Sequence, residues 1–227
     1  MTIDKIMQAN ISENNSEWPI PPELSEVFID FITMRQLYGA AIKEIRTKLE
    51  ILDDEFHVKF DHNPIHHMEY RLKTPKSIAG KLRKKQLEFS TESIRENLTD
   101  IAGVRVICNY LDDIYHIARL LVKQDDITLV RTRDYIKNPK SNGYRSLHLV
   151  VRVPVFLAES TEYVPVEVQI RTIAMDFWAS LEHQLKYKSE TQPSEELYEE
   201  LYRCAEDAYG LDMRMQAIYK SMHAEQS

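Results

Sequence analysis

The chain has 227 residues, of which 43% are hydrophobic, so it is long enough to bury the core of one domain with helical extensions. Its formal net charge of −7 argues against general affinity for nucleic acid or for anionic membrane surfaces. No stretch resembles a signal peptide or is apolar over a membrane-spanning length, which predicts a soluble, cytoplasmic protein that binds no membrane and no DNA.

The two ends of the chain differ from its middle. Residues 1–21 are polar and rich in Asn and Ser, which predicts a flexible tail before a single domain over 22–227. Long helices are expected at about 24–60 and 194–224, on either side of a core over 65–190. In both, apolar residues recur in alternating steps of four and three, typical of an amphipathic helix. Those positions are Leu24, Phe28, Phe31, Tyr38, Ile42, Ile45, Leu49, Leu52 and Phe56 in the first stripe, and Leu197, Leu201, Cys204, Ala208, Leu211, Met215, Ile218 and Met222 in the second. Each stripe packs either on the core or on another protein surface.

The core is predicted to be α+β, with helices on a mostly antiparallel or mixed sheet. Hydrophobic periodicity and turn residues indicate strands and helices in alternation. The expected strands are 66–73, 100–110, 127–136, 145–153 and 162–171, and the expected helices are 75–86, 111–124 and 172–187. Pro75 suits the first turn of its helix, since proline lacks the amide proton that this turn leaves unpaired.

Two acid-poor basic runs stand out in this acidic chain. The segment "RLKTPKSIAGKLRKK", residues 71–85, holds seven Lys or Arg and no acid, and residues 131–148 hold five against one Asp. A single run of this kind is usually a solvated surface. Two of them in an acidic chain indicate a focused site for a polyanion.

Strand alternation predicts a polar sheet face beside these runs. In "VPVEVQIRT", Glu167, Gln169 and Arg171 share one face, and in "GYRSLHLVV", Tyr144, Ser146 and His148 do. Either strand alone fits an ordinary half-exposed strand. Together they are typical of a nucleotide site, where cations hold phosphates, a ring stacks on a base and carboxylates hold Mg²⁺.

The magnesium ion needs a second carboxylate. Asp100 lies at the entrance to a predicted strand, next to Ala102 and Gly103, which allow close approach of a ligand. Spacing alone favours it no more than Asp112 or Asp113.

Four segments together resemble one known family. The segments "YRLKTPKSIAGKL", "DIAGVRVIC", "DYIKNPKSNGYRSLHL" and "VEVQIRTIAMDFWASLEHQLKYK" are similar to the synthetase domain of RelA/SpoT homologues. The whole chain resembles a small alarmone synthetase, of the RelP type more than the RelQ type. The resemblance implies a nucleotidyltransferase-like fold and transfer of the β,γ-pyrophosphate of ATP to the ribose 3′-hydroxyl of GTP or GDP. The products would be pppGpp or ppGpp and AMP.

The same resemblance assigns roles to individual residues. Arg71 and Arg105 would sandwich the adenine of ATP. The triphosphate would be held by Lys73, Ser77, Lys81 and Lys84. Asp100 would bind Mg²⁺, while Glu167 would contact Mg²⁺ and act as base for the 3′-hydroxyl. The GTP or GDP acceptor would be bound by Lys140, Tyr144, Arg145, His148, Gln169, Asp176 and His183, with Tyr144 stacking on guanine.

The resemblance also implies a homotetramer, which would give the two apolar stripes a partner. We therefore expect the 24–56 and 197–222 helices at subunit interfaces. Arg35, the one charge in the first stripe, is expected near an acid, with the 195–200 segment as a candidate.

Other interpretations concern metals and binding. The sequence "FDHNPIHH" suggests metal ligands, but a turn ahead of a strand is the simpler explanation, and no hydrolase domain is expected. Cys108 and Cys204 are expected to be buried free thiols. A non-catalytic module for guanine nucleotides or single-stranded RNA would use similar basic and aromatic residues, but it has no need of Asp100 and Glu167. A nucleotidyltransferase that releases pyrophosphate would keep both acids.

Overall fold

The computed structural model describes residues 22–188 and 195–224. Over these residues, helices and strands follow one another as predicted for a mixed α/β protein, with one additional helix. The elements are α2 (Pro22–Lys59), β1 (Ile65–Leu72), α3 (Pro75–Lys84), α4 (Thr91–Asn97), β2 (Ala102–Cys108), α5 (Leu111–Val122), β3 (Thr128–Asp134), β4 (Leu147–Phe156), β5 (Thr161–Thr172), α6 (Ile173–Lys188) and α7 (Glu195–Ala224). The predicted tail at 1–21 lies outside the described residues.

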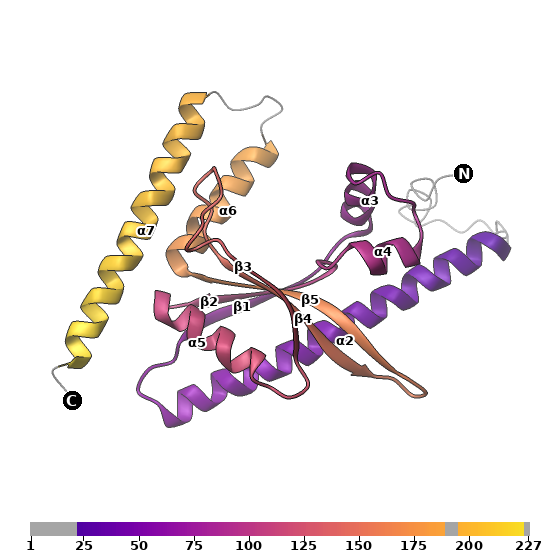
Figure 1. The fold of residues 1–227 in the computed structure, drawn as a ribbon, viewed down its shortest axis with the longest axis horizontal. Helices are drawn as coiled ribbons and strands as arrows, with labels where there is room; N and C mark the ends of the chain where they lie inside the picture. The colour runs from indigo at the N-terminus through magenta and orange to yellow at the C-terminus, as the bar shows by residue number, and fades with distance from the viewer. Residues whose placement is uncertain (1–21, 189–194, 225–227) are drawn as a thin grey trace, which may run out of the picture.

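The strands form one five-stranded mixed sheet in the order β1-β2-β5-β4-β3. The central pair, β2 and β5, is parallel, and the other neighbours are antiparallel. Figure 1 shows α2 and α5 together on one side of the sheet, with α3 and α6 extending from the other. The fold class predicted from the sequence is therefore confirmed.

The core lies between the sheet and the helices α2 and α5. Strand alternation directs Val104, Val106 and Val168 into it, and all three are buried. They belong to one apolar cluster with Ile45 of α2 and Ile117 of α5. The apolar side chains of the central strands point to this face of the sheet, so their polar side chains lie on the opposite face.

Local sequence explains how α3 and α4 begin. The Thr74 side chain accepts a hydrogen bond from the Ser77 amide, and Pro75 occupies the first helical turn of α3. The Ser90 side chain accepts from the Ser93 amide and caps α4, the helix that our sequence prediction missed. Because α4 is only seven residues long, its apolar periodicity is too short to identify.

The two apolar stripes have different outcomes. On α2, Tyr38, Ile45 and Leu49 are buried against the sheet of their own chain, so this part of the stripe packs on the core, and the place of α2 at a subunit interface stays a prediction. Arg35 donates a hydrogen bond to the backbone carbonyl of Lys73, at 3.2 Å, and its predicted acidic partner at an interface also stays a prediction. The stripe packs into the core because α2 contacts four strands of the sheet, β1, β2, β4 and β5.

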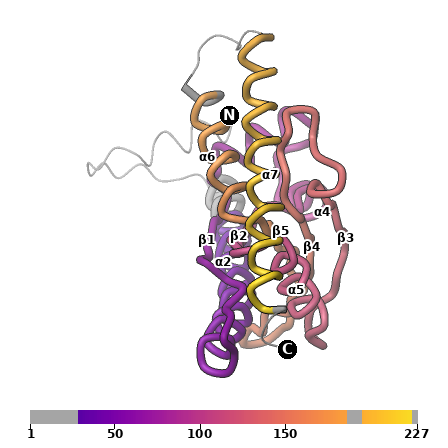
Figure 2. Tube along the Cα trace, turned by 90° about the vertical axis from the view of Figure 1, so that its left-hand side faces the viewer, coloured from indigo at the N-terminus to yellow at the C-terminus, as the bar shows by residue number. Residues whose placement is uncertain are grey.

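On α7 the predicted stripe faces outward. Figures 1 and 2 show α7 as one long helix that passes α6 and then α5, and it contacts both. It packs through a different set of residues, including Ala205, Asp212 and Gln216, which are buried. The apolar stripe residues Leu197, Leu211, Met215, Ile218 and Met222 are all exposed. Cys108 is buried as expected, whereas Cys204 is exposed because it lies on this outward side.

Candidate active site

A cleft of about 860 Å³ opens on the polar side of the sheet. It is bounded by β1 and β2, by the loop over 138–146 that precedes β4, by β5 and by α6, and Tyr198 of α7 also lines it. Its lining residues are Arg71, Arg105, Lys140, Ser141, Asn142, Tyr144, His148, Gln169, Arg171, Ala179, Ser180, Glu182, His183, Gln184 and Tyr198. The structure therefore brings together seven of the predicted nucleotide-binding residues: Arg71, Arg105, Lys140, Tyr144, His148, Gln169 and His183.

Asp100 lies beside the basic run at the end of β1 and in α3. It forms ion pairs with Lys73 and with Lys81, the latter at 2.6 Å. Burial by itself would raise the pKa of Asp100, but the hydrogen bonds and charges of these two lysines outweigh it and hold the pKa below its usual value. The carboxylate is thus ionised, and its Oδ1 atom is buried without a hydrogen-bond partner among the described residues.

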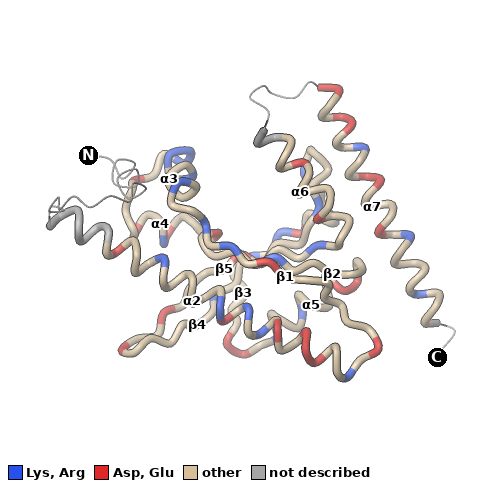
Figure 3. The backbone as a smooth tube through the Cα atoms, turned by 180° about the vertical axis from the view of Figure 1, so that it is seen from behind, with Lys and Arg blue, Asp and Glu red and all other residues tan. Residues whose placement is uncertain are grey.

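The remaining residues predicted to hold the triphosphate lie on α3. Ser77 forms part of the N-terminal cap of this helix, and Lys84 is exposed in its last turn. Figure 3 shows Lys and Arg gathered on α3 and continuing toward β1. The basic run therefore forms a positively charged surface that leads to Asp100, on the side of the acids away from the aromatic loop.

Glu167 is the second acid, on the strand next to Asp100. The register places Glu167 beside Gly103 of β2, three residues after Asp100. Its Oε2 accepts a hydrogen bond from Gln169 at 2.8 Å, and its Oε1 lies 3.6 Å from Nδ1 of His148. Burial would raise the pKa of Glu167, and the nearby Asp100 acts in the same direction, but His148 and Gln169 together hold the pKa below its usual value.

The loop before β4 presents the Tyr144 ring to the cleft. A tight turn closes through the Gly143 amide, which donates to the Lys140 carbonyl at 2.8 Å, and Gly143 adopts φ = +85°. The Lys140 ammonium lies 4.3 Å from the centre of the Tyr144 ring. The Tyr144 side chain packs against Trp178, Ala179 and Ala205, so α6 and α7 fix its position. The loop is thus ordered around an aromatic ring that is available for stacking.

Arg145 differs from its predicted role at the acceptor phosphates. Its guanidinium donates to the Ile136 carbonyl at 2.9 Å and to Glu206 of α7 at 2.7 Å, and it stacks 4.0 Å from the centre of the Tyr209 ring. The side chain does not line the cleft. Arg145 points opposite to Tyr144, so the structure places it as an anchor of the loop on α7.

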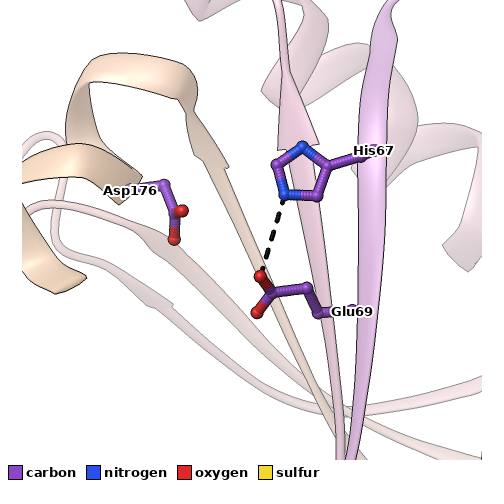
Figure 4. Close-up of side chains that lie close together, drawn as sticks. All are labelled: His67, Glu69 and Asp176. Carbon is purple, nitrogen blue, oxygen red and sulfur yellow. Dashed lines mark ion pairs between the residues drawn. The ribbon is translucent and has the colours of Figure 1, made fainter.

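Arg105 belongs to a cluster at the edge of the cleft. It pairs with Glu69 at 2.7 Å and with Asp176 at 3.5 Å, and Arg171 pairs with Asp176 at 3.3 Å. Figure 4 shows His67, Glu69 and Asp176 with their ligand-type atoms facing one another. Both carboxylates in this group are already neutralised by arginines. Asp176 therefore orients Arg105 and Arg171 and is not among the cleft-lining residues, in contrast to its predicted contact with the acceptor.

The histidines of "FDHNPIHH" divide between two structural roles. His62 lies 3.0 Å from both carboxylate oxygens of Asp113, at the start of α5, and His66 and His67 lie on β1. The segment is a turn ahead of a strand, as predicted. Asp112 and Asp113, the alternatives to Asp100 as a magnesium ligand, begin α5, on the side of the sheet opposite α3 and α6.

Eight of the residues that line the cleft were not predicted as site residues, and three of them, Arg171, Asn142 and Glu182, form polar contacts within the site. Alternation along the strand places Arg171 on the polar face without a role. Its burial depends on packing against segments that are distant in the sequence. Asn142 donates to Glu182 at 3.0 Å and joins the loop to α6. Glu182 precedes His183 in "LEHQLKYK". Nothing in the sequence alone shows that this acid is buried and lines a cleft.

The comparisons with known proteins agree with this geometry. The family model "Region found in RelA / SpoT proteins" matches residues 70–192. The GTP pyrophosphokinase YwaC of Bacillus subtilis is 43% identical over 88% of this chain and 95% of its own length. The crystal structure of small alarmone synthetase 2 from Bacillus subtilis superposes with a TM-score of 0.77 at 43% identity, over 85% of this chain and 99% of that one. That of small alarmone synthetase 1 from the same organism, bound to its product pppGpp, gives 0.76 at 38% identity, over 81% and 93%. The chain therefore belongs to the RelA/SpoT family.

Proposed function

We propose that the protein is a stand-alone GTP or GDP pyrophosphokinase, as its similarity to proteins with that name indicates. It transfers the β,γ-pyrophosphate of ATP to the ribose 3′-hydroxyl of GTP or GDP, which gives pppGpp or ppGpp and AMP. The observation that carries the proposal is the position of the acid pair. Asp100, just before β2, and Glu167, on the neighbouring β5, lie between a lysine-rich surface and an aromatic cleft.

The two sides of the acid pair suit the two substrates. Lys73 and, on α3, Lys81 and Lys84 supply the charge that a triphosphate requires, and Arg71 and Arg105, which line the adjoining cleft, would stack on adenine. Tyr144 and Lys140 supply a ring and a cation for the guanine nucleotide. A hydroxyl bound at the acceptor side then faces a phosphoryl group bound at the donor side, and the acids lie between them.

The reaction requires one proton transfer and one exchange of oxygen at phosphorus. The 3′-hydroxyl gives its proton to the carboxylate of Glu167 while its oxygen forms a bond to the β-phosphorus of ATP. The bond from that phosphorus to the bridging α,β-oxygen breaks, and its electron pair leaves with AMP. Glu167 is ionised in the resting protein, so it can accept this proton. Most of the acceleration is expected from alignment and charge neutralisation.

The donor set fits Mg²⁺. Mg²⁺ is usually held by one or two carboxylates together with substrate phosphates, and the buried, unpartnered Oδ1 of Asp100 is an oxygen of the required kind. Asp100 and Glu167 would hold the ion, which when bound neutralises charge on the transferred phosphates. Lys73 and Lys81 occupy the other oxygen of Asp100, so they keep the carboxylate ionised before nucleotide binds.

We infer that the protein assembles through α7 into a homo-oligomer, most simply the expected homotetramer. The outward stripe of Leu197, Leu211, Met215, Ile218 and Met222 is a long apolar surface on a helix whose other side is packed.

None of the described helices combines the length and apolar character needed to span a bilayer. We place its action in the bacterial cytoplasm, where its nucleotide substrates are found.

Product analysis tests the proposed function. The protein is incubated with ATP, MgCl₂ and GDP or GTP, and the nucleotides are separated by anion-exchange chromatography. We expect AMP and a guanosine nucleotide with a 3′-pyrophosphate in equal amounts, and neither product in EDTA. Formation of ADP instead of AMP would contradict pyrophosphate transfer. Nucleotide binding without any product would favour the non-catalytic binding module.

A further inference from the structure

A continuous hydrogen-bond chain links a buried arginine to Glu167. The Arg171 side chain is only 3% exposed, and its Nη2 donates to the Tyr144 hydroxyl at 3.1 Å and to Oε1 of Gln169 at 2.8 Å. The Tyr144 hydroxyl lies 2.8 Å from Nε2 of His148, and Nδ1 of His148 lies 3.6 Å from Oε1 of Glu167. Gln169 in turn donates to Oε2 of Glu167 at 2.8 Å.

The strand register explains why these groups meet. Glu167, Gln169 and Arg171 alternate along β5 and therefore share its polar face. His148 of β4 pairs directly with Gln169, so its ring lies on the same face beside Glu167. Tyr144 comes from the loop before β4 and reaches over both strands.

The first branch of the chain runs from Arg171 through Tyr144 and His148 to Glu167, and the chemistry of the donors bears on its direction. A guanidinium can only donate, so the Tyr144 oxygen accepts from Arg171. With its oxygen accepting from Arg171, the Tyr144 hydroxyl can donate its proton to Nε2 of His148, 2.8 Å away. A neutral imidazole whose Nε2 accepts a proton carries its own proton on Nδ1, and this atom faces Glu167. The Tyr135 ring packs nearly perpendicular to the imidazole of His148, with 5.1 Å between the ring centres.

The second branch runs from Arg171 through Gln169 to Glu167, and its direction is fixed because a guanidinium can only donate. Arg171 donates to the amide oxygen of Gln169, which leaves the amide nitrogen of Gln169 to donate to Glu167. Reversing this amide would place its N–H₂ group against the guanidinium and its oxygen against the carboxylate, two repulsive contacts. Both carboxylate oxygens of Glu167 thus face N–H donors whose orientation depends on Arg171.

We propose that Arg171 is a positioning residue for Glu167, acting through Tyr144 and His148 on one oxygen and through Gln169 on the other. It selects the Nδ1–H tautomer of His148 and the donating orientation of Gln169, and so holds the carboxylate toward the acceptor hydroxyl. This role rests on the proposed function of Glu167 as base. The tautomer itself is a property of the resting protein and is measurable without any substrate.

Two variants separate the branches. Tyr144→Phe keeps the ring for stacking and removes only the hydroxyl, so it interrupts the path to His148 and leaves the contact between Arg171 and Gln169. Arg171→Met removes both branches. Arg152→Met is the matched control, because Arg152 is an exposed arginine on β4 and does not line the cleft. His148→Gln identifies the imidazole signals in selectively ¹⁵N-histidine-labelled protein.

Nitrogen NMR at about pH 8.5, where an imidazole is ordinarily neutral, reports the tautomer. We expect His148 to carry its proton on Nδ1 in the parent and in Arg152→Met, and to shift toward the Nε2–H form in Tyr144→Phe. In steady-state assays, Tyr144→Phe should lower kcat about five- to tenfold, the effect of one hydrogen bond, with KM for GTP within about twofold. Arg171→Met should lower kcat further, by about a hundredfold.

The outcomes that overturn the proposal are distinct from failure of the proposed function. An Nε2–H tautomer of His148 in the parent protein, or an unchanged tautomer in Tyr144→Phe, would refute the role of the chain whatever the activity. If Arg171→Met fails to fold, Tyr144→Phe still decides the first branch. A parent protein that makes no AMP would refute the proposed function and leave the tautomer result standing.

Discussion

Replacing Gly143 with alanine tests how the acceptor loop depends on its contact with α7. Gly143 has φ = +85°, and a Cβ atom there would lie 2.5 Å from the Cβ of Ala205 and 3.4 Å from a ring carbon of Tyr202. The left-handed backbone costs an alanine about 1–2 kcal/mol. The overlap with Ala205 cannot be relieved by rotation, because both atoms are fixed to backbone, and forced displacement of this kind costs about 1–3 kcal/mol.

A total penalty of about 3 kcal/mol corresponds to roughly a hundredfold change in an equilibrium constant. Because the loop carries Lys140 and Tyr144, the penalty is expected in GTP binding. We predict that Gly143→Ala lowers kcat/KM for GTP by about a hundredfold, measured by AMP formation, while the dissociation constant of ATP changes by less than about twofold.

The double variant Gly143→Ala with Ala205→Gly separates the two parts of this penalty, the steric overlap and the backbone strain. Removing the Ala205 Cβ relieves the overlap but not the backbone strain, so about half of the lost free energy should return. Gly210→Ala is the matched control, since nothing lies within 4 Å of its Cβ position and Gly210 is within α7. That variant should leave kinetics unchanged and stabilise the helix by about 0.5–1 kcal/mol. Normal GTP kinetics in Gly143→Ala, or no recovery in the double variant, would refute the reasoning.

Three further predictions concern the acids, the aromatic ring and pH. Glu167→Gln and Asp100→Asn each keep shape but remove charge, so turnover should fall by at least about a hundredfold with the folded circular-dichroism spectrum retained, and near-normal turnover would exclude that residue from the mechanism. Tyr144→Ala should weaken GTP binding about tenfold or more and leave ATP binding unchanged by calorimetry; an equal loss for ATP would place the ring on the donor side. Burial raises the pKa of Asp212 to about 6, so the folded protein keeps a proton that the unfolded chain releases from about pH 4 upward. The free energy of unfolding should therefore fall as pH rises from about 4 to 6, and Asp212→Asn should abolish this fall and exceed the parent by about 1–2 kcal/mol at pH 8 in urea. Equal stability of the two at pH 8 would contradict the assignment.

The parts of the fold that follow local rules were predictable from the sequence. Alternation placed Glu167 and Gln169 on one face of a strand, as the structure shows, because strand periodicity is a property of neighbouring residues. The motifs name Asp100 as the partner acid, and that role stays a prediction.

The errors arise where a contact joins distant segments. Arg145 was expected at the acceptor phosphates, but its partner Glu206 lies 61 residues further along the chain. The two apolar stripes have the same spacing, yet only that of α2 is buried by its own chain. Spacing shows that a stripe exists and does not reveal what covers it, and α7 packs through Asp212 and Gln216, which no hydrophobic pattern marks.

Isotope position gives the most direct test of the central claim that the acceptor hydroxyl attacks the β-phosphorus of ATP. ATP labelled with ¹⁸O at the bridging α,β-oxygen is incubated with GDP and MgCl₂, and the products are analysed by mass spectrometry. Pyrophosphate transfer predicts that all of the label leaves in AMP and that the 3′-pyrophosphate of the guanosine product contains none. Label in free pyrophosphate, together with a guanosine nucleotide carrying AMP, would show attack at the α-phosphorus and contradict the account.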